Sequence, residues 1–164
     1  MIGATFYRVA FLNLDDMDTI AEYKLIAAKG DIHKAAIDLL QENNLPVTDL
    51  GPDKHLFALI QNTTILGTGG LEFFEDCALL RSVSVKKNWR GKGLGQIISK
   101  ELEKISRQKG IDCLYLLTDS AKDFFAKEGY REIEREDVPI SIKNTSEFSS
   151  VCPASAIVMR KMLQ

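Results

Sequence analysis

The residues with the clearest chemical potential form a basic, glycine-rich segment, Arg90-Gly91-Lys92-Gly93-Leu94-Gly95. Its glycines let the backbone approach a ligand closely and adopt positive φ where a turn requires it. An amphipathic helical pattern begins at the same place, so backbone N–H groups would point at the ligand from a helix N-terminus, where the helix dipole favours negative charge. Arg90 and Lys92 add positive side chains. The segment predicts a site for phosphate or another anion.

Two well-known nucleotide-binding loops have a different spacing. A P-loop requires G-x-x-x-x-G-K-S/T, and this string does not occur in the sequence. A dinucleotide-binding fingerprint requires G-x-G-x-x-G, followed by an acidic residue after the next strand. Here the glycines run G-x-G-x-G behind an arginine. A plain glycine-rich turn before an ordinary helix is the remaining alternative at this level.

The elements on either side of the loop can be predicted from the hydrophobic pattern. A strand is expected over residues 77–85 and a helix over residues 93–108. A buried strand over residues 112–118 and a short helix over residues 120–128, capped by Ser120, come next. The inward-facing residues of the longer helix are Leu94, Ile97, Ile98, Leu102 and Ile105.

The segment before the loop is expected to supply a hairpin. Its strands would cover residues 56–61 and 64–73 around Asn62-Thr63, with glycines 67, 69 and 70 weakening or bulging the second strand. Residues 15–29 are ambiguous between a helix capped by Asp15-Asp16 and a strand over residues 23–28. The other expected elements are strands over 4–14, 129–134 and 156–162 and, after Gly30-Asp31, a helix over 32–40.

Taken together with its neighbours, the loop resembles a known family. Residues 90–95 are similar to the Q/R-x-x-G-x-G/A pyrophosphate loop of the GNAT superfamily, the acetyl-CoA-dependent N-acetyltransferases, and Leu80-Arg81-Ser82-Val83-Ser84-Val85 resembles that family's fourth strand. The run from Leu116 to Tyr130 resembles its strand-five and helix-four unit, A-x-x-F/Y-Y/F-x-x-x-G-F/Y. The resemblance favours the strand in the ambiguous segment before the first helix.

The resemblance implies a fold and a co-substrate. The fold would be α/β, with a central mixed, mostly antiparallel sheet of about seven strands that splays between strands four and five and carries helices on both faces. Acetyl-CoA would insert at the splay, and no metal is implied. The residues implied to contact it are Val83, Ser84, Val85, Arg90, Gly91, Lys92, Gly93, Leu94, Gly95, Gln96, Ser120, Phe124, Phe125 and Lys127.

Acetyl transfer to an amine requires a neutral nitrogen nucleophile, so a general base is expected. Many family members carry a glutamate at the position of Leu79, which this chain lacks. Glu72 is the nearest replacement, and Glu75 and Asp119 are competitors, although each could be an ordinary solvated carboxylate. The thioester oxygen is expected to receive a backbone N–H near Val83 or Ser84.

Phe125 differs from the usual family pattern, and Arg81 needs a partner of opposite charge. Phe125 replaces a tyrosine that in many members protonates the departing thiolate, so Tyr130 or water would have to supply that proton, and Phe125 would be a wall of the channel. Arg81 lies among apolar residues of a strand and needs a counter-charge. It could hold a substrate carboxylate through a bidentate fork, or form an internal ion pair with Glu72 or Asp119.

The C-terminal third narrows the resemblance within the family. Residues 137–148 and 152–161 resemble GNAT proteins encoded in arsenic-resistance operons, which read V-P-x-x-I-x-x-T-x-E-F-x-x-x-C-P-x-S-A. They are also similar to the acetyl-transfer domain of N-acetylglutamate synthase, but Cys152-Pro153-Ala154-Ser155 stands where that enzyme has a basic stretch. Cys152 is more simply a structural residue than an arsenic ligand.

Composition limits the alternatives. The chain has 164 residues, 45% hydrophobic and 27% charged, and a net charge of −2. These values predict a single soluble domain over residues 1–164, with an N-terminal extension at about 1–22, and argue against nucleic acid or an anionic membrane as the partner. Three cysteines without a C-x-x-C pair suit a reducing cytoplasm, and His33 and His55 have no ligands at metal-binding spacing.

The sequence therefore predicts an enzyme that transfers acetyl from acetyl-CoA to the primary amine of a small, amino-acid-like acceptor. Two alternatives remain open: a peptide or protein N-acetyltransferase, which would need an open groove, and a CoA-binding sensor without turnover. A homodimer is also left open.

Overall fold

The computed structural model describes residues 7–11, 21–51 and 54–163. Their strands form one eight-stranded sheet in the order β1-β2-β3-β4-β5-β6-β8-β7, where about seven strands were expected. The strands are β1 (Tyr7–Phe11), β2 (Ala21–Ala27), β3 (His55–Gln61), β4 (Thr64–Phe73), β5 (Cys77–Val85), β6 (Cys113–Thr118), β7 (Arg131–Ile133) and β8 (Ile157–Met162). Neighbouring strands are antiparallel except β5 and β6, which are parallel. The mixed α/β class is confirmed.

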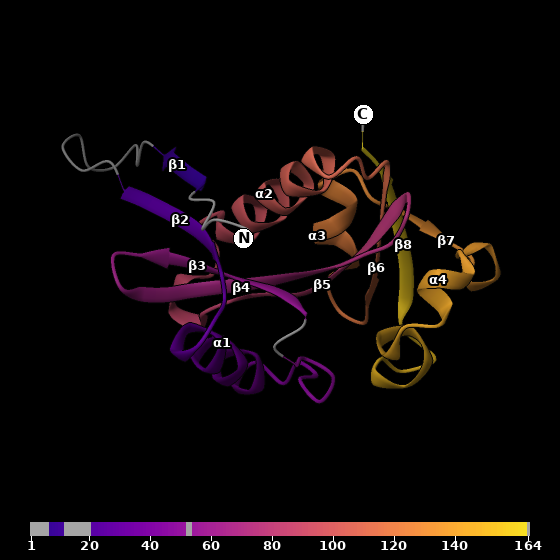
Figure 1. Ribbon diagram of the computed structural model, residues 1–164, viewed down its shortest axis with the longest axis horizontal. Coiled ribbons are helices and arrows are strands. Elements are labelled where there is room, and N and C mark those ends of the chain that lie inside the picture. Colours follow the sequence, from indigo (N-terminus) through magenta and orange to yellow (C-terminus); the bar gives the residue numbers. More distant parts are fainter. Residues whose placement is uncertain (1–6, 12–20, 52–53, 164) are drawn as a thin grey trace.

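Helices cover both faces of this sheet (Figure 1). α1 lies on one face against β3 and β4, and α2 lies on the other face against β4 and β5, beside α3. The helices are α1 (Asp31–Glu42), α2 (Leu94–Gln108), α3 (Lys122–Lys127) and α4 (Ile140–Lys143), with short 3₁₀ turns at Lys87–Trp89 and Arg135–Asp137 and a π-helical turn, η3, at Glu147–Val151. The five apolar residues expected to face inward from α2 are all buried.

The glycines of β4 allow α2 to pack close to the sheet. A Cβ atom at Gly69 would lie 2.5 Å from Leu102 Cδ1, and one at Gly67 would lie 2.7 Å from Ile98 Cδ1. Real atoms do not approach so closely, so these positions need glycine. The irregularity predicted for this strand is also confirmed, because the register between β3 and β4 shifts between Leu59 and Ile60, where β4 has one extra residue, Leu66.

β5 and β6 separate after a short parallel ladder. In the described part of the chain, their pairing consists of Cys77, Ala78 and Leu79 with Cys113, Leu114 and Tyr115. On its other edge β6 pairs with β8 along its whole length, so Leu116, Leu117 and Thr118 keep a partner on that side only. The two strands therefore diverge at their C-terminal halves, which confirms the expected splay.

Several expected boundaries shift. β2 confirms a strand in the ambiguous segment, whereas most of the N-terminal extension lies outside the described residues. The cap at Ser120 is wrong, because α3 begins at Lys122 and its preceding residue Ala121 donates its N–H to Thr118 Oγ1 at 2.9 Å. Thr118 thus holds the residue before the helix, and among the described residues no side chain accepts a first-turn N–H of α3.

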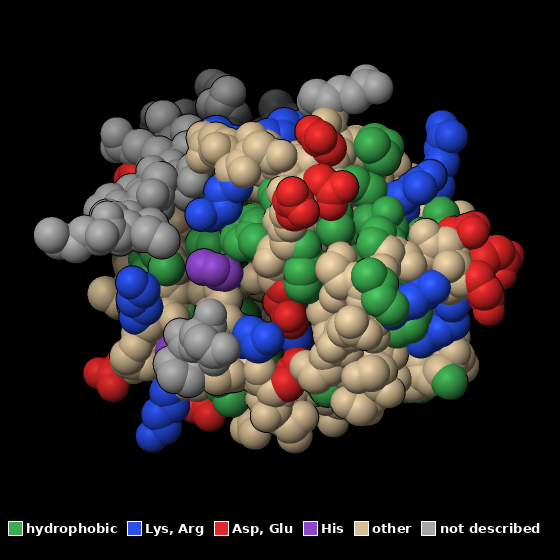
Figure 2. Space-filling model, turned by 45° about the vertical axis from the view of Figure 1, so that its right-hand side comes forward, with side chains coloured by type: hydrophobic (Ala, Val, Ile, Leu, Met, Phe, Trp, Pro, Cys, Tyr) green, Lys and Arg blue, Asp and Glu red, His purple; other side chains and the backbone are tan. Residues whose placement is uncertain are grey.

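The surface shows charges of both signs. On the face in Figure 2, hydrophobic side chains form a band across the middle, with acidic and basic side chains scattered around it. Within the described residues, no helix has both the length and the apolar character needed to cross a membrane.

Candidate functional site

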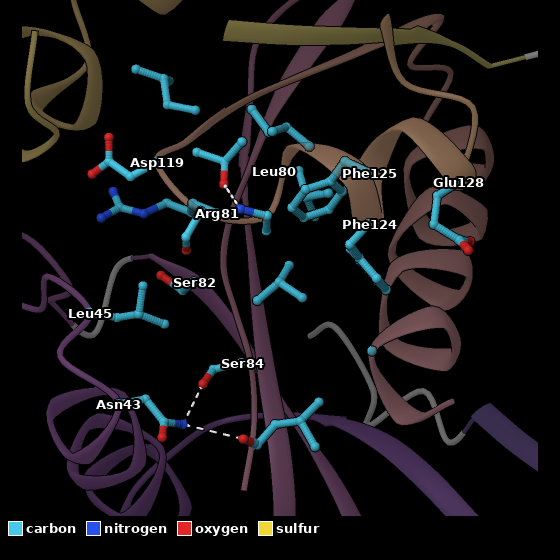
Figure 3. A pocket seen from close by; sticks show the side chains of 18 of the residues that line it. Asn43, Leu45, Leu80, Arg81, Ser82, Ser84, Asp119, Phe124, Phe125 and Glu128 are labelled. Carbon is cyan, nitrogen blue, oxygen red and sulfur yellow. Dashed lines mark hydrogen bonds between the residues drawn. The ribbon is translucent and has the colours of Figure 1, made fainter. Parts of the chain in front are cut away.

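A cleft of about 990 Å³ opens where β5 and β6 diverge. Its borders are the N-terminus of α2, the segment after α1, the start of α3, and residues 147–156. In Figure 3, Phe124 and Phe125 lie on one side of the cleft, and Arg81 and Asp119 lie on the other. We call the part around Arg90–Gln96 the loop end, and the part around Arg81, Asp119, Glu147 and Cys152 the charged end.

At the loop end the backbone has the conformation that the glycines were expected to provide. Gly91 and Gly93 have φ angles of 77° and 78°, and Gly93 directly precedes α2. At the third glycine, Gly95, a Cβ atom would lie 3.3 Å from Phe124 Cζ, a tight contact that a small shift of the Phe124 ring would have to relieve. The segment thus turns into a helix of 15 residues with its N-terminus at the cleft, which is the arrangement that favours bound anions.

Arg90 is held in place by the C-terminal end of α1. Its Nη2 donates to Asn43 Oδ1 at 2.7 Å, and its Nε donates to the Val85 carbonyl at 3.1 Å. Asn43 in turn donates to Ser84 Oγ at 2.6 Å (Figure 3). Asn43 was not identified from the sequence.

The expected cofactor residues gather at this cleft. Lys92 is the exception: its Nζ lies 4.7 Å from the centroid of the Trp89 ring, and it does not line the cleft. The expected residues that do line it are Val83, Ser84, Val85, Arg90, Gly91, Gly93, Leu94, Gly95, Gln96, Ser120, Phe124, Phe125 and Lys127.

A bulge in β5 reaches the middle of the cleft. Ser82 has a φ angle of 56°, and its carbonyl accepts a hydrogen bond from Thr68 Oγ1 at 2.8 Å. In the register of the described strands, Thr68 pairs with Ser84 and Gly70 with Arg81, so Ser82 and Val83 have no partner on β4. The backbone N–H predicted to face a thioester oxygen belongs to this bulge, and it remains a prediction.

At the charged end, Arg81 is surrounded by three carboxylates. Its side chain is only 1% exposed. Asp49 accepts from Nη1 at 2.5 Å and from Nη2 at 2.7 Å; Glu72 accepts from Nη1 at 2.5 Å, and Glu147 lies 2.6 Å from Nη2. The internal ion pair with Glu72 is therefore confirmed, and two unexpected carboxylates join it.

This arrangement corrects the expected role of Arg81 as a clamp for a substrate carboxylate. Both terminal nitrogens of the guanidinium already donate to the protein's own carboxylates. Burial by itself acts to lower the pKa of Arg81, but the three carboxylates raise it above its usual value. The group is a structural cation at the base of the cleft.

The three carboxylates do not share the same environment. Burial acts to raise the pKa of Asp49, but hydrogen bonds from Arg81 and Ser146 lower it to about 2. Burial raises the pKa of Glu147, and Asp49 and Glu72 raise it further, although Arg81 opposes them. Glu147 also accepts a hydrogen bond from the Cys152 thiol at 3.3 Å, and burial followed by that carboxylate raises the pKa of Cys152 to about 12.

Glu72 and Tyr130 lie away from the cleft, which corrects their expected roles as base and acid. Glu72 lines a separate hollow beside Lys54, whose Nζ lies 3.2 Å from its carboxylate. Tyr130 is 2% exposed and packs edge-on against Phe125 with ring centroids 5.5 Å apart. Burial, followed by Glu103, raises the pKa of Tyr130 above its usual value. Of the carboxylates considered from the sequence, Asp119 lines the cleft.

Sequence reasoning missed Asp49 and Glu147. Glu147 belongs to the T-x-E-F pattern noted in the sequence, but nothing in the pattern says that it contacts Arg81. Asp49 lies in a segment without a motif. The cysteines show no metal site: Cys77 and Cys113 are buried, and among the described residues no group of three potential ligands could hold a metal ion.

The site and fold can now be compared with known proteins. A sequence model of the acetyltransferase (GNAT) family matches residues 19–131. An N-acetyltransferase of Chlorobaculum tepidum is 30% identical over 79 residues, which are 48% of this chain and 50% of that protein. A Bacillus subtilis protein described as an acetyltransferase is 28% identical over 126 residues, 69% of this chain and 85% of that protein.

Solved structures show the same fold at low identity. N-acetylglutamate synthase from Neisseria gonorrhoeae, complexed with coenzyme A and N-acetyl-glutamate, superposes with a TM-score of 0.72 at 18% identity and covers 89% of this chain. This chain spans 36% of that enzyme and half of the Chlorobaculum tepidum relative. Because the family match extends over more than half of its length, the chain belongs to the GNAT acetyltransferase family.

Proposed function

We propose that the protein is an acetyl-CoA-dependent N-acetyltransferase that acts on the primary amine of a small acceptor. The observation that carries the proposal is the cleft between the diverging strands β5 and β6, which is lined by all but one of the residues that the family resemblance assigned to the co-substrate. The amine would attack the thioester carbonyl carbon, and the acetyl group would pass directly from sulfur to nitrogen.

The residues of the cleft fit coenzyme A in two respects. At the loop end, the positive φ angles of Gly91 and Gly93 and the N-terminus of α2 suit a pyrophosphate. Between the loop and the charged end, Phe124 and Phe125 form an apolar wall opposite the β5 bulge, which suits the pantetheine arm. Coenzyme A is also present in the N-acetylglutamate synthase structure. When bound, acetyl-CoA supplies the activated acetyl group.

The interactions that link separate segments at the charged end support a small acceptor. Ser146 Oγ donates to Asp49 Oδ2 at 2.6 Å, which joins the segment after α1 to the segment between α4 and η3. The bidentate pair between Arg81 and Asp49 ties the same segment to β5. These links narrow the space beyond the bulge, whereas a peptide or protein acceptor would need an open groove.

Thiol release tests the proposal directly. The full chain is incubated with acetyl-CoA and a panel of primary amines, including free amino acids, their amides, dipeptides, diamines and aminoglycosides, and free CoA thiol is measured. We expect release that depends on one class of small amine. Release with peptides alone would favour a peptide N-acetyltransferase. CoA binding by calorimetry without release on any amine would favour a sensor and would contradict the proposed activity.

The closer relationship to arsenic-resistance-operon proteins is also a proposal. Its support is that Glu147 and Cys152, two residues of the shared C-terminal pattern, both line the charged end. Adding amines that carry arsenic to the panel tests it. Residence in the cytoplasm stays a prediction.

A further inference from the structure

The side chains at the charged end of the cleft and directly behind it include more acidic than basic groups. Asp49, Glu72 and Glu147 surround Arg81, and Lys54 is the second cation of the group, at 3.2 Å from Glu72. With every group ionised, three negative charges face two positive ones. Asp119 lines the same end of the cleft and adds a further carboxylate. Without Asp119 the group lacks one positive charge, and with Asp119 it lacks two.

Of the three carboxylates around Arg81, Glu147 has the weakest set of positively charged and hydrogen-bonding partners. Asp49 has both terminal nitrogens of Arg81 and the Ser146 hydroxyl as donors. Glu72 is shared between Arg81 and Lys54. Glu147 has one guanidinium nitrogen and the weak thiol donor of Cys152. Only 7% exposed, it is the one carboxylate of the three that lines the cleft.

We propose that Glu147 binds the acceptor's ammonium group and removes its first proton, as the general base of the reaction. This inference rests on the proposed acetyl-transfer function and deepens it. An incoming ammonium supplies the missing positive charge, and a carboxylate that is short of donors accepts a proton readily. Arg81 fixes the position of one carboxylate oxygen through its 2.6 Å contact.

The protons and electrons of the step balance. The ammonium gives one proton to the Glu147 carboxylate, and the neutral nitrogen forms a bond to the thioester carbonyl carbon. The carbon–sulfur bond then breaks with its electron pair on sulfur, and the second proton of the nitrogen passes to that thiolate. Glu147 returns its proton to solvent. The products are the N-acetylated amine, CoA thiol and one proton.

The same charge distribution indicates the acceptor class. Arg81 has no terminal nitrogen left for an outside carboxylate, and an acceptor carboxylate would face Asp119 and Glu147. An amine without a carboxylate on the neighbouring carbon meets no such repulsion. Acceptors of this class should therefore be preferred over the matching free amino acids.

The test compares Glu147→Gln with Glu72→Gln, a matched pair because both side chains contact Arg81 and only Glu147 lines the cleft. Thiol release is measured from pH 5 to 9 with the most active amine of the panel. Glu147→Gln should lower kcat about 100-fold or more and remove the acidic limb of the kcat/KM profile, with an unchanged Kd for CoA. Glu72→Gln should keep the acidic limb. The charged groups facing Glu147, namely Arg81 (β5), Glu72 (β4) and Asp49 (after α1), and the neutral thiol of Cys152 (after η3) remain in the first variant.

The possible outcomes distinguish the assignment of Glu147 as the general base from the proposed acetyl-transfer function. An acidic limb that persists in Glu147→Gln, or that disappears in Glu72→Gln alone, overturns the assignment of Glu147. If Glu147→Gln does not fold, Glu147→Asp serves instead: it keeps the charge, and we expect a reduced kcat with the acidic limb still present. An unchanged kcat and limb in that variant would also count against the assignment. No release from the wild-type protein on any amine overturns the proposed function, and the assignment with it.

The acceptor class is tested with pairs that differ by one charge. Glycinamide is compared with glycine, and glutamic acid 1-amide with glutamate, in the wild-type protein. We expect kcat/KM to be at least about 10-fold higher for the amide of each pair, which corresponds to about 1.4 kcal/mol. Equal values, or higher values for the free acids, would overturn the charge argument.

Discussion

The two ends of the cleft are built in different ways. The loop end comes from one continuous segment, in which Val85, Arg90, Gly91, Gly93 and Gly95 are neighbours in the chain and follow each other from strand to helix. The charged end depends on four separate segments, which place Asp49, Glu72 and Glu147 around the Arg81 guanidinium. The first is defined by local conformation and the second by burial and charge.

This difference predicts which end tolerates change. A local loop can be altered at one position with effects confined to ligand binding. A buried charge group depends on every member, because removing one leaves the others without a counter-charge. Mutations at the charged end should therefore alter stability first, and mutations at the loop end should alter CoA affinity first.

The largest effect is expected for Arg81→Met. Asp49, Glu72 and Glu147 would then lie together in the interior without their shared cation, and breaking a buried pair costs about 3–5 kcal/mol. Urea denaturation at pH 7 should show a loss of this size in the free energy of unfolding. Lys122→Met, which removes the exposed ion pair with Glu132, is the control and should change stability little. Similar small losses in both variants would contradict the structural role of Arg81.

The next largest effect is the loss of folding stability at low pH. The pKa of Asp49 is about 2 in the folded protein against a usual 3.8, so its ionised form stabilises the fold above pH 4, and this contribution is lost as the pH falls toward 2. The contribution of ionised Asp49 to the free energy of unfolding is at most about 2 kcal/mol before solvent screening is taken into account. Glu147 acts in the opposite direction, because its raised pKa makes protonation favour the folded state.

Unfolding measured at several pH values from 2 to 6 tests this prediction. Asp49→Asn should be less stable than the wild-type protein at pH 6, and the difference should shrink toward pH 2. A constant difference across this range would show that the charge of Asp49 does not stabilise the fold. Binding of CoA at pH 6 should remain, since Asp49 lies away from the loop end.

A smaller effect is expected at the loop end from Gly91→Asp. Aspartate tolerates positive φ better than most residues, and nothing lies within 4 Å of the position, so the fold should persist. A negative charge beside the N-terminus of α2 should weaken CoA binding about 10-fold, measured by calorimetry. Gly110→Asp is the matched control, with a φ of 76° and open space at the other end of α2. Equal Kd values in the two variants would contradict the anion site.

The smallest effect is expected for Phe125→Tyr. The added hydroxyl would stand where many relatives have a proton donor, but a thiol with a pKa of about 8.5 is already an adequate leaving group near neutral pH. We expect kcat to change less than roughly threefold, measured by thiol release with the best amine. A gain above 10-fold would mean that protonation of the thiolate limits the reaction in the natural protein.

The sequence predicted most of the fold and one end of the site. Strands β3 to β6 and helix α2 lie close to their expected ranges, because their apolar patterns repeat at strand or helix spacing and end at turn residues. Phe124 and Phe125 also line the cleft as expected. The ion pair of Arg81 with Glu72 was one of two expected arrangements and is confirmed, whereas Glu72 and Tyr130 do not line the cleft. Both outcomes depended on which buried neighbours a side chain meets. The register shift in β4 was indicated only by its glycines.

What the sequence determined by itself was the conformation and charge of the loop, since positive φ, a helix N-terminus and nearby positive charge all follow from residues adjacent in the chain. What only the tertiary structure decided was the charge balance around Arg81. Asp49 and Glu147 are 98 positions apart in the chain, and no local rule relates them. Their contact with one guanidinium depends on how α1, η3 and β5 pack together, and of the three carboxylates that contact Arg81, Glu147 is the one that lines the cleft.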